Sequence, residues 1–121
     1  MTSVGAQDFE PPDGVFLVLL EHGITVAGGA LRRLSSDTCE VKRMWTAPEH
    51  RRKGHASAVL DALEDAARDR GYSCLRLETG PAQPEARSLY ECRGYNQIPT
   101  YGNYEQATAF ELLLGAEEAS E

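Results

Sequence analysis

The first third of the chain consists of apolar runs separated by short turn sequences. Residues 14–20, 24–34 and 38–45 are rich in aliphatic and β-branched side chains. Such runs predict three strands that form an antiparallel meander. Within the second run, the pair Gly28-Gly29 indicates a bulge or the close approach of another backbone.

Between residues 54 and 70 the apolar positions take on the period of a helix. They recur at spacings of three and four residues, which predicts one buried helical face. These positions are Ala56, Val59, Leu60, Leu63, Ala66 and Ala67. Gly71 then provides a stop signal at the C-terminal end.

The remainder of the chain alternates between the two kinds of element. A strand at 74–79, a helix at 84–92 and strands at 95–98 and 107–114 complete the order β-β-β-α-β-α-β-β. A strand, a helix and a second strand in succession form a βαβ unit, whose strands are parallel and whose crossover is right-handed. The sequence therefore predicts an α+β fold with a mixed sheet.

The length of 121 residues suits one domain. Residues 1–13 are polar and contain two adjacent prolines, so they predict a flexible lead-in, and residues 115–121 predict an acidic tail. A single domain is expected over residues 14–114.

Net charge and the length of the apolar runs limit which partners and which cellular location we expect. Twelve Lys and Arg residues against nineteen Asp and Glu residues give a net charge of −7, which disfavours nucleic-acid binding. The longest apolar run, residues 15–20, is far shorter than the roughly 20 residues that span a bilayer. The N-terminus resembles no secretory signal. We expect a cytoplasmic protein with no nucleic-acid or membrane partner.

The cysteines are odd in number and contain no C-x-x-C pair. Cys39, Cys74 and Cys92 therefore indicate a reducing compartment and structural roles, not a disulfide framework or a cysteine zinc site. The three histidines show no metal-ligand spacing with them, and the sequence leads us to expect no metal.

The segment Arg51-Arg52-Lys53-Gly54-His55-Ala56 precedes the long helix. A helix N-terminus has unpaired N–H groups and a partial positive charge, so it can bind an anion. Gly54 and Ala56 lack bulk and would allow an anion to approach the backbone. The segment matches neither G-x-x-x-x-G-K-[ST] nor G-x-G-x-x-G. It predicts a phosphate or pyrophosphate site, with a basic loop that only caps the helix as the alternative.

Three segments together resemble one family. The R-x-x-G-x-A pattern at residues 51–56 resembles the pyrophosphate loop of the GNAT superfamily of acyl-CoA-dependent N-acyltransferases. Residues 75–80 and 84–95, which read LRLETG and PEARSLYECRGY, resemble the family's next strand and its A-x-x-L-Y-x-x-x-G-[FY] helix. The resemblance covers roughly residues 14–114.

The resemblance implies a GNAT-like fold whose two central parallel strands, 38–45 and 74–79, splay apart to admit the pantetheine arm of acetyl-CoA. The arm would pair with backbone like an added strand, and the pyrophosphate would lie on amides of the basic loop. The implied cofactor-binding residues are Met44, Trp45, Thr46, Arg51, Arg52, Lys53, Gly54, His55, Ala56, Gln83 and Tyr90.

The resemblance also implies catalytic residues. Tyr90 would protonate the departing thiolate, and a buried core tyrosine is the alternative. Glu40 is a candidate base, but a cross-strand charge pair explains it equally well. Glu78 is the competing candidate, for which we favour a structural role. The implied activity is transfer of an acetyl group to a small-molecule amine or an exposed protein amine by direct attack on the thioester. The alternative is a non-catalytic CoA-binding or acetyl-CoA-binding protein.

Family members usually begin with a strand and one or two helices ahead of the meander. Residues 1–13 show no such elements, and those helices normally form one wall of the acceptor site. Their lack would leave sheet edge and apolar surface uncovered, which leads us to expect a homodimer.

Overall fold

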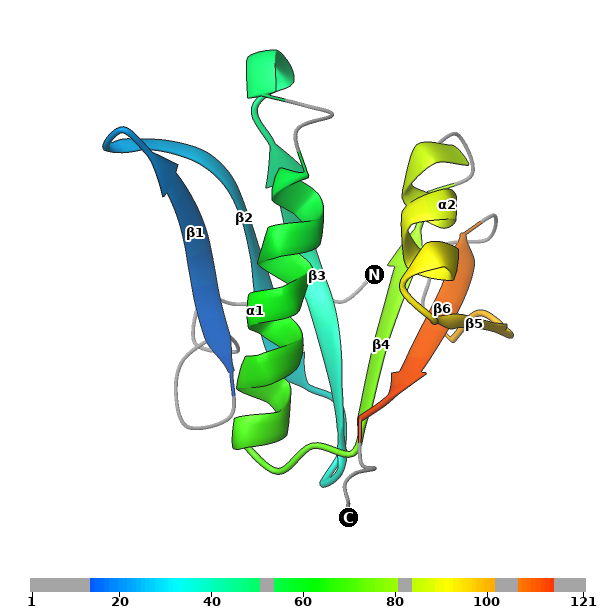
Figure 1. Cartoon of the computed structure of the whole chain (residues 1–121). Coiled ribbons are helices and arrows are strands. Elements are labelled where there is room, and N and C mark those ends of the chain that lie inside the picture. The colour runs from blue at the N-terminus through cyan, green and yellow to red at the C-terminus, as the bar shows by residue number, and fades with distance from the viewer. Residues whose placement is uncertain (1–13, 51–53, 81–83, 102–106, 115–121) are drawn as a thin grey trace.

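The computed structural model describes residues 14–50, 54–80, 84–101 and 107–114, so the predictions for 1–13 and 115–121 fall outside the described residues. The chain forms one six-stranded sheet in the order β1-β2-β3-β4-β6-β5 (Figure 1). The strands are β1 Val15–Glu21, β2 Ile24–Arg33, β3 Thr38–Thr46, β4 Cys74–Thr79, β5 Asn96–Ile98 and β6 Thr108–Leu113.

Two helices pack on one face of this sheet: α1 His55–Asp69 and α2 Pro84–Cys92 (Figure 1). A 3-10 turn, η2 Pro48–His50, lies between β3 and α1. The predicted α+β class, element order and mixed sheet are confirmed, with small differences at the ends of elements. No helix in the described part of the chain is long and apolar enough to cross a bilayer.

The parallel pair at the centre of the sheet is short. β3 pairs with β4 only through Thr38–Cys74, Cys39–Leu75 and Glu40–Arg76. β3 nevertheless continues to Thr46 alongside β2. Figure 1 shows β3 and β4 meeting at one end and diverging toward the end where α1 begins. The splayed central strands that the resemblance implied are therefore present.

The expected irregularity at Gly28-Gly29 is present, and its extra residue lies in the neighbouring strand. Gly28 pairs with Trp45, whereas Ala30 pairs with Lys42, so two residues of β3 lie opposite Gly29. One of them, Arg43, has φ 58, a backbone conformation that residues other than glycine seldom adopt. The bulge lies in β3, and the two glycines occupy the positions of β2 beside it.

Close packing explains the first of these glycines. A Cβ on Gly28 would lie 2.8 Å from Trp45 Nε1 and 2.9 Å from the carbonyl oxygen of Leu17. The backbone oxygen cannot move aside as a side chain can, so glycine is required at this position.

The apolar core lies between the sheet and the helices. Alternate residues of β2 and β3, such as Leu31, Cys39 and Val41, are buried with Leu60 and Leu63 of α1. Because successive side chains of a strand point to opposite faces, Arg32, Glu40 and Lys42 project from the face that carries no described helix. The two faces of the sheet therefore differ in chemistry.

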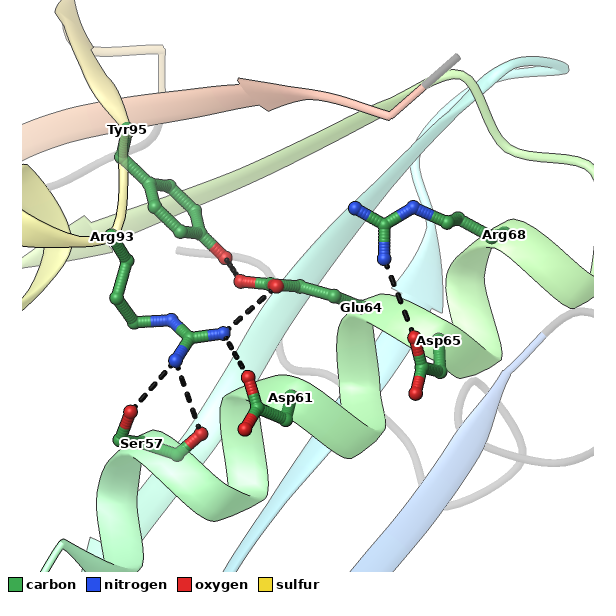
Figure 2. Close-up of polar contacts among 7 residues, drawn as sticks. All are labelled: Ser57, Asp61, Glu64, Asp65, Arg68, Arg93 and Tyr95. Atoms are coloured by element: carbon green, nitrogen blue, oxygen red, sulfur yellow. Dashed lines mark hydrogen bonds and ion pairs between the residues drawn. The ribbon is translucent and has the colours of Figure 1, made fainter. Parts of the chain in front are cut away.

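A polar cluster joins the end of α2 to α1 inside the helix layer (Figure 2). Arg93 donates to Asp61 Oδ1 at 2.6 Å, to Glu64 Oε1 at 2.8 Å and to the Ser57 hydroxyl oxygen at 2.7 Å. The Tyr95 hydroxyl donates to Glu64 Oε2 at 2.8 Å. Both carboxylate oxygens of the buried Glu64 therefore have partners, and α2 is fixed relative to α1.

Candidate active site

The opening between β3 and β4 follows directly from the end of their pairing. Beyond Glu40 and Arg76 the two strands no longer pair. Beyond this point, the edge of β3 that faces β4 thus carries backbone N–H and C=O groups that are not paired with the described part of β4. Such an edge can accept an extended ligand through backbone hydrogen bonds, as in strand addition.

Three predicted cofactor residues, Met44, Trp45 and Thr46, end β3 at this opening. A Cβ on Gly29 would meet Met44 Sδ and the α1 side chain of Leu63, so Met44 lies on the helix side. Trp45 lies over Gly28 on the opposite face and is 40% exposed. The extra residue of the bulge sets these directions.

The N-terminus of α1 lies at the same end of the sheet (Figure 1). Gly54 is its N-cap residue, with φ 81, ψ 8 and no side-chain capping bond. Its carbonyl accepts a bond from the Ala58 N–H at 3.0 Å. The first turn, which begins at His55 and Ala56, contains no acidic residue. The exposed Gly54 and the helix start therefore retain the amides and positive potential that an anion requires.

Four other predicted cofactor residues cannot be placed. Arg51, Arg52, Lys53 and Gln83 lie outside the described residues. Their roles stay predictions.

Tyr90 lies on α2 and is only 6% exposed. Its ring centroid is 5.5 Å from that of Tyr95 and 5.7 Å from that of Phe110. Burial raises the pKa of the Tyr90 hydroxyl, so the group stays protonated at neutral pH. Since Phe110 belongs to the core under the helices, Tyr90 lies on the helix-covered face.

Glu40 projects from the other face of the sheet, at the last position where β3 pairs with β4. It is 2% exposed, and its Oε1 accepts a bond from Arg32 Nε at 2.9 Å, with Lys42 Nζ at 3.8 Å. Its Oε2 accepts a bond from the Tyr101 hydroxyl at 2.7 Å. A cross-strand charge pair was the alternative that the sequence offered for Glu40, and the structure has such a pair with Arg32 of β2.

Tyr101 is a site residue that the sequence analysis missed. Its backbone N–H donates to Glu78 Oε2 at 3.2 Å, and the guanidinium carbon of Arg76 lies 5.8 Å from its ring centroid. Burial and the hydrogen bond to Glu40 raise the pKa of the Tyr101 hydroxyl. Tyr101 follows β5 outside any periodic segment, so no pattern in the sequence points to its place beside Glu40.

The cysteines are free thiols, of which Cys39 and Cys74 are buried and Cys92 is exposed. Burial raises the pKa of Cys39 to about 12 and also raises that of Cys74. These two thiols are therefore poor nucleophiles, in agreement with structural roles.

Comparison with known sequences points to one family. Residues 2–95 match the family described as Acetyltransferase (GNAT) family. The chain is 34% identical over 104 residues to YsnE, an uncharacterized N-acetyltransferase of Bacillus subtilis, and the match covers 84% of this chain and 69% of YsnE. Matches to the first three curated relatives span between 57% and 69% of their lengths.

Solved structures agree with this result. A protein of Klebsiella pneumoniae assigned as an acyl-CoA N-acyltransferase superposes with TM-score 0.82 at 30% identity, covering 91% of this chain and 79% of that one. A GNAT family acetyltransferase of Elizabethkingia anophelis, solved with acetyl-CoA bound, has the same fold with TM-score 0.74 at 17% identity, covering 84% and 77%. The chain belongs to the GNAT family of acetyltransferases.

Proposed function

We propose that this protein is an N-acetyltransferase that uses acetyl-CoA to acetylate a primary amine. The observation that carries the proposal is the divergence of β3 and β4 after three paired positions, at the end of the sheet where α1 begins. The bound acetyl-CoA in a GNAT structure of the same fold supports the choice of donor. None of the comparisons favours the non-catalytic alternative.

In this proposal the protein binds the coenzyme mainly through backbone groups. The pantetheine arm pairs with β3 around Met44, Trp45 and Thr46, and Gln83 is a further proposed contact of the arm. The pyrophosphate lies at the start of α1, on amides from Arg52 to Ala56, with Arg52 and Lys53 adding positive charge and Arg51 either binding the coenzyme or forming a salt bridge at the helix start. The uncapped Gly54 supports this placement, because a side-chain cap would occupy the amides that the anion needs.

The chemistry requires one proton to leave the amine and one to reach the sulfur. The neutral amine attacks the thioester carbonyl carbon, a C–N bond forms, and the C–S bond breaks to release CoA thiolate. Tyr90 donates its hydroxyl proton to that thiolate, and its raised pKa keeps the proton available at neutral pH. General acid catalysis of this kind contributes about 10²–10⁴-fold to the rate.

For the base we propose Glu40, acting directly or through a water molecule. Its burial and its contact with Tyr101 at the start of the divergence support this role. Its bond to Arg32 equally supports a structural role, and Glu78 is the competing carboxylate. Glu40 projects from the face of the sheet without a described helix, whereas Tyr90 belongs to α2 on the other side. In this proposal the thioester lies between the splayed strands, within reach of both groups.

The acceptor is a small-molecule amine or an exposed amine of a protein. The net charge of −7 favours a cationic acceptor through electrostatic steering. The free cysteines fit a reducing compartment, which supports a cytoplasmic location.

We also propose that the protein is a homodimer. Phe16, Val18 and Leu20 of the edge strand β1 are 50%, 53% and 58% exposed on the face without a described helix. A second copy covering this strip would remove apolar surface from water.

The test is a thermal-shift titration with acetyl-CoA and CoA, followed by an assay of free-thiol release across a panel of amines. Ligand at 100 times its dissociation constant adds about 2.7 kcal/mol to the stability. We expect a clear shift with both ligands and thiol release with at least one amine. The absence of any shift would overturn the coenzyme site, and a shift without release would favour a binding protein.

A further inference from the structure

Three side chains with metal-ligating atoms meet beside the start of α1. Glu21 ends β1, His50 ends η2 and His55 begins α1. One ligand atom from each side chain lies within 4.8 Å of the other two. The sequence predicted no metal, because the spacing of these residues along the chain gives no indication that they meet.

The carboxylate of Glu21 lies between the two imidazoles. Its Oε1 is 3.1 Å from His50 Nδ1 and 3.9 Å from His55 Nε2. The two imidazole centroids are 6.0 Å apart. The side chains of His50 and His55 are 23% and 13% exposed, and that of Glu21 is 38% exposed. The cluster is therefore partly buried and is most exposed at Glu21.

Two facing nitrogens, His50 Nδ1 and His55 Nε2, are buried. Within the described part of the chain neither is in hydrogen-bonding geometry with another group, although Glu21 Oε1 lies 3.1 Å from the first. A buried polar atom without a partner is costly and indicates a group that would satisfy it. Here both atoms face the same carboxylate, so a single cation between the three residues would satisfy them together.

We propose that Glu21, His50 and His55 bind a divalent transition-metal ion, with zinc the best match. Two imidazole nitrogens and one carboxylate oxygen are a known three-residue set for zinc, and they leave a fourth position for water or a ligand. Zinc bonds of about 2.0–2.2 Å place tetrahedral donors roughly 3.3–3.6 Å apart. The Glu21–His50 separation is close to this value, and the other pairs reach it through small side-chain rotations.

The position of this site connects it with the proposed coenzyme loop. His50 and His55 flank residues 51–54 in the sequence, and the metal would tie both flanks to the end of β1. A bound ion would hold the start of α1, where the anion is proposed to lie, in a fixed position relative to β1 and η2, and such preorganisation favours binding. Bound zinc would therefore tighten coenzyme binding, a consequence that rests on the proposed function.

The test is calorimetric titration of the full chain, free of any affinity tag, with zinc chloride. We expect one ion per chain. His50→Gln and His55→Gln should each weaken binding by more than about 100-fold, since loss of a residue that only orients a ligand already costs about 10–100-fold. Far-UV circular dichroism of both variants shows whether they fold.

Two variants control for other zinc ligands. His22→Asn removes the exposed histidine next to Glu21, at a position with φ 52 that asparagine accepts, and Cys92→Ser removes the exposed thiol. Both should bind zinc like the unmodified protein. No zinc binding, or binding that survives both His50→Gln and His55→Gln, overturns the proposal.

Coenzyme titrations with and without zinc separate the two proposals. A chain that binds zinc but neither CoA nor acetyl-CoA would overturn the proposed function and leave the metal site standing. Equal coenzyme affinity in both titrations would overturn the link between metal and loop.

Discussion

The two faces of the sheet differ in what they bury. The face under α1 and α2 holds the apolar core, including Leu63 and Phe110, and its main polar cluster, centred on Glu64, has partners for both carboxylate oxygens. The opposite face carries ion pairs such as Arg32–Glu40 and an exposed apolar strip on β1.

This difference separates stability from recognition. Residues under the helices are constrained by packing, so substitutions there should chiefly lower the free energy of unfolding. The other face carries the proposed base Glu40 and the exposed apolar strip on β1, so substitutions there should chiefly change activity or association. Tyr90 is the expected exception, because it packs from α2 into the core and is also proposed to act in the chemistry.

The largest expected effect is that of Tyr90→Phe. Phenylalanine keeps the ring that packs on Tyr95 and Phe110 but has no proton to donate. We expect kcat to fall by about 10²–10⁴-fold while acetyl-CoA affinity by calorimetry stays nearly unchanged. Tyr95→Phe is the matched control, since it removes a hydroxyl that bonds Glu64 instead, and its kcat should fall far less. Undiminished turnover in Tyr90→Phe would rule out the acid role.

On the opposite face, Glu40→Gln tests the proposed base. Glutamine preserves the shape and can still accept the bond from Tyr101, but it cannot take a proton. We expect kcat/KM to fall by roughly 100-fold, with Glu78→Gln as the control that stays active. A purely structural Glu40 would instead show a lower urea midpoint and nearly normal kcat/KM in the folded variant.

The fold was largely predictable because its signals are local. Periodicity identified α1, which begins at His55, and the βαβ order fixed the parallel pair. The bulge was predicted only in part. The Gly28-Gly29 pair is visible in the sequence, but the extra residue Arg43 is in the partner strand, where nothing in its own neighbourhood marks it.

The site was less predictable because it depends on contacts between distant residues. The family motif pointed to Tyr90 and Glu40, whereas Tyr101 reaches Glu40 across 61 positions of sequence. In the sequence, Glu64 is likewise one of several charged positions on α1, and only the structure shows its bonds to Arg93 and Tyr95. Such pairs follow from the tertiary arrangement and carry no periodic signal of their own.

For stability, Leu63→Ala and Val18→Ala compare the two faces directly. Leu63 is fully buried against the sheet, whereas Val18 is 53% exposed. Leu63→Ala should lower the free energy of unfolding by about 2–5 kcal/mol through lost burial and a cavity. Val18→Ala should change it by less than about 0.5 kcal/mol. Urea unfolding measures both, and equal losses would contradict the division between the faces.

A smaller effect is expected from the buried tyrosines at alkaline pH. Burial and the adjacent Glu64 raise the pKa of Tyr95 above its ordinary value. The unfolded chain then releases this proton at lower pH than the folded one. The stabilisation is full below about pH 10 and declines above it by about 1.4 kcal/mol per pH unit. Tyr95→Phe should reduce that slope in urea unfolding. Tyr90, Tyr101 and the buried thiols of Cys39 and Cys74, whose pKa values are also raised, should account for the remainder. An unchanged slope would show that Tyr95 ionises alike in both states.

The smallest expected change in stability is that of Val18→Lys, which tests association. A lysine in the centre of the exposed strip on β1 places a charge in the proposed dimer interface, where it would be desolvated. We expect light scattering to show a dimer for the unmodified protein and a monomer for the variant, with the urea midpoint of the monomer nearly unchanged. Ala62→Lys, on the exposed side of α1, is the matched control and should remain dimeric. If the unmodified protein is a monomer at micromolar concentration, the homodimer proposal is overturned and the strip on β1 has another role.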